Sequence, residues 1–165
     1  MDKKVRLGII GLGNMGSGHA NNIRNGLCPE IELVAVADTN PDRIAWGKEN
    51  LPAGITYFDD AIAMLDSGLI DGCIVSVPHY FHPTYVIECL KRGIHVMSEK
   101  PAGVYTKQVR EMNEEAAKHP DVVFGLMFNQ RTNCVYRKMR ELVQSGKYGE
   151  IRRTNWIITN WYRPQ

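Results

Sequence analysis

The chain has 165 residues and a formal net charge of +2, with 44% hydrophobic and 23% charged residues. This composition is typical of a soluble globular protein, and the length allows one full domain and the start of a second. The small net charge argues against nucleic acid or an acidic membrane as a partner, and no apolar run approaches the roughly 20 residues that a membrane span needs.

Two further features indicate a cytoplasmic protein. The residues before position 7 contain no apolar stretch long enough for a secretory signal. The four cysteines form no C-x-x-C pair, so their spacing favours reduced thiols over disulfides or a zinc site. We therefore expect no bound metal.

The chain begins with the pattern of a dinucleotide-binding turn. An apolar run at 7–10 predicts a buried strand, and it leads into Gly11, Gly13 and Gly16 at G-x-G-x-x-G spacing, with a helical pattern directly after. Gly11 permits the tight turn, Gly13 lets the backbone approach a pyrophosphate, and Gly16 lets the helix pack against the strand. The start of that helix offers free backbone N–H groups to phosphates. Without this setting the glycines would be a weak signal, because glycine-rich turns are common.

Strands and helices alternate along the following hundred residues. The apolar runs predict six strands, at 7–10, 31–37, 55–58, 72–77, 94–97 and 122–127. Apolar residues at helical spacing, bounded by caps, Pro and Gly, predict helices near 14–25, 41–51, 60–69, 83–92 and 106–118. This alternation predicts an α/β fold, a Rossmann-type doubly wound parallel sheet with its ligand crevice at the carboxyl ends of the strands.

The pattern changes after the sixth predicted strand. A polar stretch precedes one more amphipathic helix at about 135–144, and the run 151–162 is rich in β-branched and aromatic residues, which predicts a long strand. We therefore expect a dinucleotide-binding domain at 1–128. Residues 129–165 would then form the first helix and strand of a truncated C-terminal α+β domain, and such an unpaired strand invites pairing with another chain.

Asp38, at the end of the second predicted strand, strengthens the dinucleotide interpretation. A carboxylate at this position accepts hydrogen bonds from both ribose hydroxyls of an adenosine and repels the extra phosphate of NADP, which favours NAD. Arg43 lies close enough in sequence to pair with a 2′-phosphate, so NADP stays open as an alternative. The plainer explanation of Asp38 is a solvated turn or capping residue.

A second group of polar residues follows the fifth predicted strand, in Glu99-Lys100-Pro101. A lysine at this strand end would lie close to a nicotinamide ring, where its ammonium would stabilise the alkoxide that develops as a hydride leaves. Glu99 would hold the charge of Lys100 in place or contact the cofactor ribose. A surface ion pair in a loop is an equally simple explanation.

Two other loops add candidates at the same edge of the sheet. His79 and His82 follow Pro78 at the end of the fourth predicted strand and would contact cofactor or substrate, although a loop histidine is more often simply exposed. Arg131, after the sixth strand, would reach the nicotinamide or a polar substrate, unless its stretch is only a domain junction. His19 falls within the first helix, where structural packing is the better explanation.

The order of these motifs resembles the glucose–fructose oxidoreductase/inositol dehydrogenase (Gfo/Idh/MocA) family. The similarity rests on Gly-Leu-Gly-Asn-Met-Gly-(x)2-His-Ala, on Ala-Asp at the second strand end, on Val-Pro-His-Tyr-Phe-His-Pro and on Glu-Lys-Pro-Ala. It covers 5–128 closely and 135–162 more loosely. The resemblance implies an NAD(P)-dependent oxidoreductase that passes a hydride between the nicotinamide C4 and a sugar, polyol or related hydroxy compound.

The resemblance also implies roles for individual residues, with Lys100 as the catalytic one. The expected cofactor-binding residues, to which the polar stretch adds Arg131, are Gly11, Gly13, Asn14, Met15, Asp38, Pro78, His82 and Glu99. The first four would line the pyrophosphate and Asp38 the adenosine ribose. Because an X-Pro bond adopts the cis form at modest cost, we also expect a cis bond between Lys100 and Pro101.

The chain departs from the family in length. Family members are about twice as long, and many carry an acid–base histidine in an Asp-x-x-x-His-type motif of their second domain, which is absent after Glu150 here. We expect this chain to bind NAD without turning over a substrate alone, and a complete protein to form a homo-oligomer through its C-terminal sheet. The alternatives are a non-catalytic NAD-binding sensor or regulatory module and an NAD-dependent glycosidase. A methyltransferase is disfavoured because Glu-Lys-Pro has no role in one.

Overall fold

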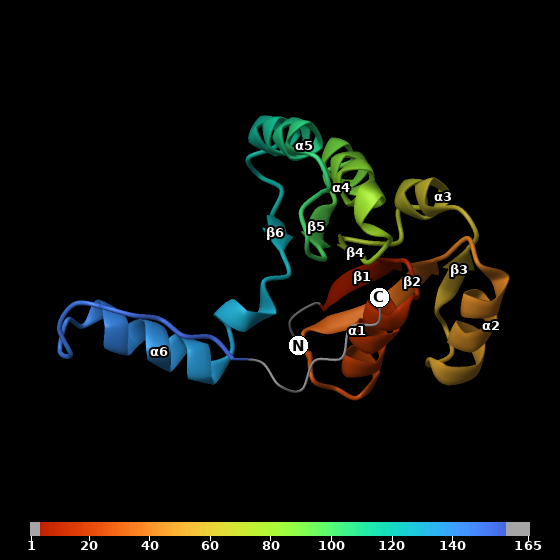
Figure 1. The fold of residues 1–165 in the computed structure, drawn as a ribbon. Helices are drawn as coiled ribbons and strands as arrows, with labels where there is room; N and C mark the ends of the chain where they lie inside the picture. Colours follow the sequence, from red (N-terminus) through yellow and green to blue (C-terminus); the bar gives the residue numbers. More distant parts are fainter. Residues whose placement is uncertain (1–3, 158–165) are drawn as a thin grey trace. The chain divides into compact units, whose positions relative to one another are not determined.

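The computed structural model describes residues 4–157, and the chain divides into two compact units, Met1–Met127 and Phe128–Gln165. The first unit contains a six-stranded parallel sheet with helices on both faces (Figure 1). Within residues 4–157, no helix is long and apolar enough to cross a membrane. The same part of the chain contains no cluster of three or more His, Cys, Asp or Glu side chains able to hold a metal ion.

All six predicted strands are confirmed, each within two residues of its expected ends. They are β1 (Val5–Ile10), β2 (Ile31–Ala37), β3 (Thr56–Phe58), β4 (Gly72–Val75), β5 (His95–Ser98) and β6 (Phe124–Leu126). The strands lie parallel in the order β3-β2-β1-β4-β5-β6. This order is that of the doubly wound dinucleotide-binding fold and confirms the predicted Rossmann-type sheet, with the strand order reversing beside β1.

The predicted helices are also present between the strands. They are α1 (Asn14–Arg24), α2 (Pro41–Asn50), α3 (Ala61–Asp66), α4 (His82–Lys91) and α5 (Thr106–Lys118), and a 3-10 turn, η1 (His79–Phe81), precedes α4. Asn40 caps α2 and Asp60 caps α3, each by accepting hydrogen bonds from backbone N–H groups of the first turn. Asp60 is thus the N-cap of α3, and α3 ends at Asp66, before the predicted end near position 69.

Alternating side chains on the central strands build two apolar cores, one on each face of the sheet. On β1, Ile9 belongs to one core and Ile10 to the other, and Ile74 and Val75 on β4 divide in the same way. Residues of α1 and α2 cover the first core, whereas α3, α4 and α5 cover the second. Because both faces of these strands are covered, their sequences are almost continuously apolar.

The second unit starts with a 3-10 turn, η2 (Asn129–Arg131), followed by α6 (Cys134–Gln144), which is the predicted amphipathic helix. The strand predicted at 151–162 is wrong over 151–157, where the backbone has no regular secondary structure, and the rest of it lies outside the described residues. A strand forms only where a neighbouring strand supplies hydrogen-bond partners, and no described segment pairs with 151–157. The assignment of 129–165 to a truncated domain stays a prediction.

Candidate functional site

The turn between β1 and α1 requires glycine at two positions. Gly11 has a φ of 91°, and a Cβ there would lie 2.7 Å from the carbonyl oxygen of Ser76 at the end of β4. A Cβ at Gly16 would overlap the carbonyl oxygen of Gly11, so α1 packs against the turn only with glycine at this position. A Cβ at Gly13 would meet no atom within 4 Å. The space beside Gly13, at the start of α1, is therefore open to a ligand.

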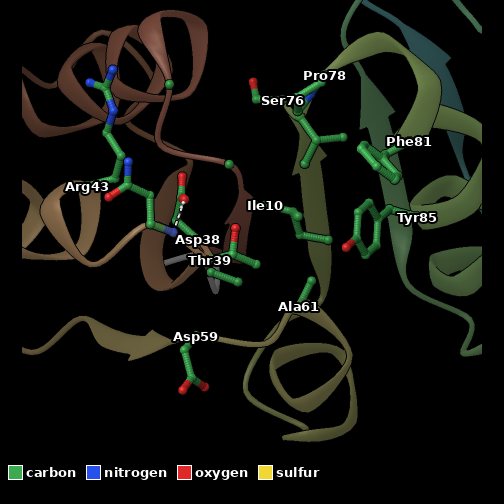
Figure 2. A pocket seen from close by; sticks show the side chains of 15 residues that line it. Ile10, Asp38, Thr39, Arg43, Asp59, Ala61, Ser76, Pro78, Phe81 and Tyr85 are labelled. Atoms are coloured by element: carbon green, nitrogen blue, oxygen red, sulfur yellow. Dashed lines mark hydrogen bonds between the residues drawn. The ribbon is translucent and has the colours of Figure 1, made fainter.

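A pocket of about 400 Å³ lies beside this turn, at the carboxyl ends of β1, β2 and β4. The predicted site residues that line it are Gly11, Gly13, Asp38 and Pro78. Figure 2 shows Asp38 and Arg43 along one side of the pocket and Pro78 and Phe81 along the other. Three of the four strand ends that the sequence indicated thus converge on one cavity.

Asp38 connects the glycine turn to the start of α2. Its Oδ2 accepts a hydrogen bond from the backbone N–H of Leu12 at 2.7 Å, and its Oδ1 accepts one from the backbone N–H of Asn40 at 2.8 Å. These two bonds fix the orientation of the carboxylate in the pocket wall. Each carboxylate oxygen has a second lone pair, so Asp38 is also able to accept hydrogen bonds from ribose hydroxyls.

Ser76 is a pocket residue that the sequence analysis missed. The residue lines the pocket, and its hydroxyl oxygen is buried and has no hydrogen-bond partner among the described residues. A buried hydroxyl without a partner is unfavourable, and a polar ligand atom in the pocket would supply one. The available signal was its position at the end of the fourth strand, two residues before Pro78.

The carboxylate of Glu99 is buried, and its partner is His19 of α1 rather than the ammonium of Lys100. Glu99 Oε1 lies 2.8 Å from His19 Nε2, and Glu99 Oε2 accepts the backbone N–H of Lys100 at 3.2 Å. Of the two roles expected of Glu99, the charge contact with Lys100 is therefore wrong, whereas a contact with the cofactor ribose stays a prediction. His19 has a polar role that periodicity alone did not reveal. The Lys100–Pro101 bond is cis, as predicted.

His82 is buried between two loops of the site. Its Nε2 lies 2.8 Å from the carbonyl oxygen of Val77 and its Nδ1 lies 2.7 Å from the carbonyl oxygen of Pro101. Only 1% of the residue is exposed. Neither ring nitrogen is free to contact a cofactor, so we revise the expected contact: His82 joins the loop after β4 to the loop after β5.

The remaining predicted residues do not line the pocket. Asn14 and Met15 are exposed on the first turn of α1, and Lys100 follows the end of β5 with its side chain exposed. Neighbouring strands lie about 4.7–4.9 Å apart, so the ends of β2 and β5, three spacings apart, are separated by about 14 Å along the sheet edge. Arg131 belongs to the second unit, and its contact with a cofactor stays a prediction.

Comparison with known proteins identifies the family of this site. Residues 5–126 match the Gfo/Idh/MocA family, described as an oxidoreductase family with an NAD-binding Rossmann fold. The chain belongs to this family. The myo-inositol 2-dehydrogenase of Thermotoga maritima is 32% identical over 146 residues, which are 88% of this chain and 42% of that protein. The rhizopine catabolism protein MocA of Rhizobium meliloti is 28% identical and is covered to 45%.

Solved structures of the same family share the fold. The scyllo-inositol dehydrogenase of Lactobacillus casei, with bound NAD(H) and scyllo-inositol, has a TM-score of 0.84 and 32% identity over 90% of this chain and 43% of that one. The WlbA dehydrogenase of Bordetella pertussis, in complex with NADH and UDP-GlcNAcA, has a TM-score of 0.81 and 25% identity over 89% of this chain and 44% of that one. This chain thus spans less than half the length of these Gfo/Idh/MocA proteins.

The pocket residues fit NAD, the cofactor of this family's Rossmann fold. Gly13 leaves space for a phosphate at the start of α1, and Asp38 presents an oriented carboxylate at the end of β2. Ser76 lines the same pocket, and its buried hydroxyl is without a hydrogen-bond partner among the described residues. These three features lie on three neighbouring strand ends, the place where a doubly wound sheet binds a dinucleotide.

Proposed function

We propose that this chain is the NAD-binding part of an oxidoreductase that passes a hydride between the nicotinamide ring and a hydroxyl-bearing carbon of a polyol or sugar. The observation that carries the proposal is the Asp38 carboxylate, held by Leu12 and Asn40 in the wall of the pocket beside the glycine turn. The named activities of the relatives, inositol 2-dehydrogenase among them, support a polyol as substrate.

The order of strand ends gives the direction in which the cofactor would lie. The adenosine ribose would contact Asp38 at the end of β2, and the pyrophosphate would lie beside Gly11 and Gly13 at the end of β1. The nicotinamide end would then extend past Pro78 toward Lys100 after β5. In this orientation the reacting carbon would lie toward the side of the site where Lys100 follows β5.

When bound, NAD supplies the hydride acceptor or donor of the reaction. The exposed ammonium of Lys100 would donate a hydrogen bond to the substrate oxygen and stabilise the negative charge that develops on it during oxidation. The hydroxyl proton has to pass to a general base. We propose that this base belongs to the part of the relatives' length that the chain does not span, so that the chain alone binds the cofactor without turning over a substrate.

Fluorescence titration of the chain with NADH and with NADPH tests the proposal. We expect NADH to bind at least about tenfold more tightly than NADPH, because the Asp38 carboxylate would repel a 2′-phosphate. Asp38→Asn keeps a hydrogen-bond acceptor and removes the charge, so it is expected to abolish most of this preference. Asp59→Asn, which removes another carboxylate from the same pocket lining, is the matched control. Tighter binding of NADPH to the unaltered chain would overturn the role of Asp38.

A further inference from the structure

The loop that carries Lys100 is held by a histidine on each side of that residue. We define the Lys100 loop as residues 99–101, directly after β5. His19 of α1 contacts Glu99, the residue before Lys100, and His82 of α4 contacts Pro101, the residue after it. The Lys100 side chain itself has no hydrogen bond or ion pair with any residue between 4 and 157. The contacts that hold the backbone at Lys100 are therefore those of its neighbours Glu99 and Pro101.

The contact between His19 and Glu99 connects the phosphate end of the site to this loop. The side chains of His19 and Glu99 are only 15% and 6% exposed, and a hydrogen bond to a carboxylate in such a dry environment is stronger than one in water. Glu99 uses its second oxygen to accept the backbone N–H of Lys100. A shift of α1 or loss of the His19 imidazole would therefore change the position of the backbone at Lys100.

The contact made by His82 connects the same loop to the pocket wall. Its two ring nitrogens lie beside two carbonyl oxygens, of Val77 in the pocket lining and of Pro101 in the Lys100 loop. A neutral imidazole donates from one nitrogen and an imidazolium from both, so in either state the ring donates to at least one of the two carbonyls. The ring is also buried between the two loops, where it packs against both.

We propose that His19 and His82 are positioning residues, which hold Lys100 beside the nicotinamide end of the site through Glu99 and Pro101. The inference rests on the proposed function, since it assigns these histidines to the placement of Lys100 against a bound dinucleotide. It goes beyond that function, which gives neither histidine a contact with the cofactor or the substrate. In this arrangement both histidines act on the backbone around Lys100.

The test measures acylation of Lys100 by acetic anhydride with mass-spectrometric detection, in the presence and absence of NADH. Lys107, which is 86% exposed on α5, serves as the internal reference. In the unaltered chain we expect NADH to slow acylation of Lys100 by about threefold or more, while ADP, which lacks the nicotinamide half, leaves it unchanged. The affinities of the same chain for NADH and for ADP are measured in parallel by calorimetry.

The variants separate positioning from general damage. His19→Leu removes the hydrogen bond to Glu99 and is expected to abolish the protection of Lys100, with ADP affinity within about twofold of the unaltered chain. His19→Gln, which still donates an N–H, is expected to restore protection. His82→Leu removes both ring nitrogens, and with them the contacts with the Val77 and Pro101 carbonyl oxygens, and is expected to lose most of the protection.

Each outcome supports or overturns the inference. Full protection of Lys100 in both His19→Leu and His82→Leu would overturn it, and so would a parallel loss of ADP affinity, which would indicate structural damage to the whole site. Binding of neither NADH nor ADP by the unaltered chain would instead overturn the proposed function, and the inference with it. Loss of protection with retained ADP binding, and recovery in His19→Gln, would support the inference.

Discussion

At the scale of single residues, Ser76 shows how a binding site differs from a packed core. Its buried hydroxyl lacks a hydrogen-bond partner among the described residues, and the residue lines the pocket beside the glycine turn and Asp38. A folded protein with such a hydroxyl in its core would be more stable without the hydroxyl. The unfavourable free energy of this unpaired hydroxyl is explained if a ligand atom supplies the missing hydrogen-bond partner when the pocket is filled.

Ser76→Ala is therefore expected to leave the melting temperature of the free chain unchanged or slightly higher, and to weaken NADH binding about threefold to tenfold, the loss of one hydrogen bond. Thermal melts and NADH titrations measure the two effects. Ser67→Ala is the control, because that hydroxyl donates to the Met64 carbonyl in α3: it should lower stability and leave NADH affinity unchanged. A Ser76→Ala chain that melts lower and binds NADH normally would contradict the assignment.

Residues that act through local spacing could be predicted from the sequence, and residues that act through distant partners could not. Gly11, Gly16 and Asp38 stand at fixed intervals around one turn, which made their roles visible. His19 and Glu99 are 80 positions apart, and only the folded sheet brings α1 beside the end of β5. For the same reason His82 was expected at the cofactor, whereas its ring nitrogens lie beside backbone carbonyls of two loops.

At the scale of elements, ion pairs at the carboxyl end of α4 join it to α3. Arg92, just after α4, donates to Asp66 at the end of α3 at 2.6 Å and also pairs with Glu88 one turn earlier. Hydrogen bonds from Arg92 lower the pKa of Asp66 and, together with those from Lys91, the pKa of Glu88. A carboxyl group whose pKa is lowered by folding stabilises the fold above its unfolded pKa of about 4, and this contribution is lost as the pH falls.

We therefore expect Arg92→Ala to lower the melting temperature at pH 7, and the difference from the unaltered chain to shrink as the pH falls below about 4. Thermal melts across this pH range measure the effect. Lys107→Ala is the control: its contact with Glu111 is 3.9 Å long and exposed, so it should change the melting temperature little at any pH. A deficit in Arg92→Ala that stays constant from pH 7 to pH 3 would contradict this account.

The strands of the first unit could be predicted because the central strands are buried on both faces of the sheet, and such strands have almost continuously apolar sequences. The segment 151–157 carries the same β-branched and aromatic signal, yet it forms no strand. The pattern reports what a segment would do beside a partner strand, and no described segment supplies one. Strand propensity is thus a statement about packing context more than about the backbone itself.

At the scale of the whole molecule, the proposed cofactor site and the proposed catalytic lysine both belong to the first unit. Asp38, the glycine turn, Pro78 and Lys100 follow four neighbouring strands of one sheet. Hydride transfer also needs a general base and contacts that orient the substrate, and relatives of more than twice this length have further chain to supply them. We therefore expect cofactor binding and substrate turnover to be separable in this chain.

We expect the chain to bind NADH and yet to produce none from NAD and myo-inositol at a measurable rate. A missing general base alone costs about 10²–10⁴ in rate, and the loss of substrate contacts lowers the rate further, because the substrate is no longer held against the nicotinamide. Formation of NADH, followed by absorbance, measures turnover, with the myo-inositol 2-dehydrogenase of Thermotoga maritima as the positive control. Oxidation within about a hundredfold of that control, abolished by Lys100→Ala, would show that the first unit already contains a base. His19 would then be the first residue to test for that role, since its ring is bound to Glu99 beside Lys100 and, unlike His82, has only one nitrogen in a hydrogen bond among the described residues.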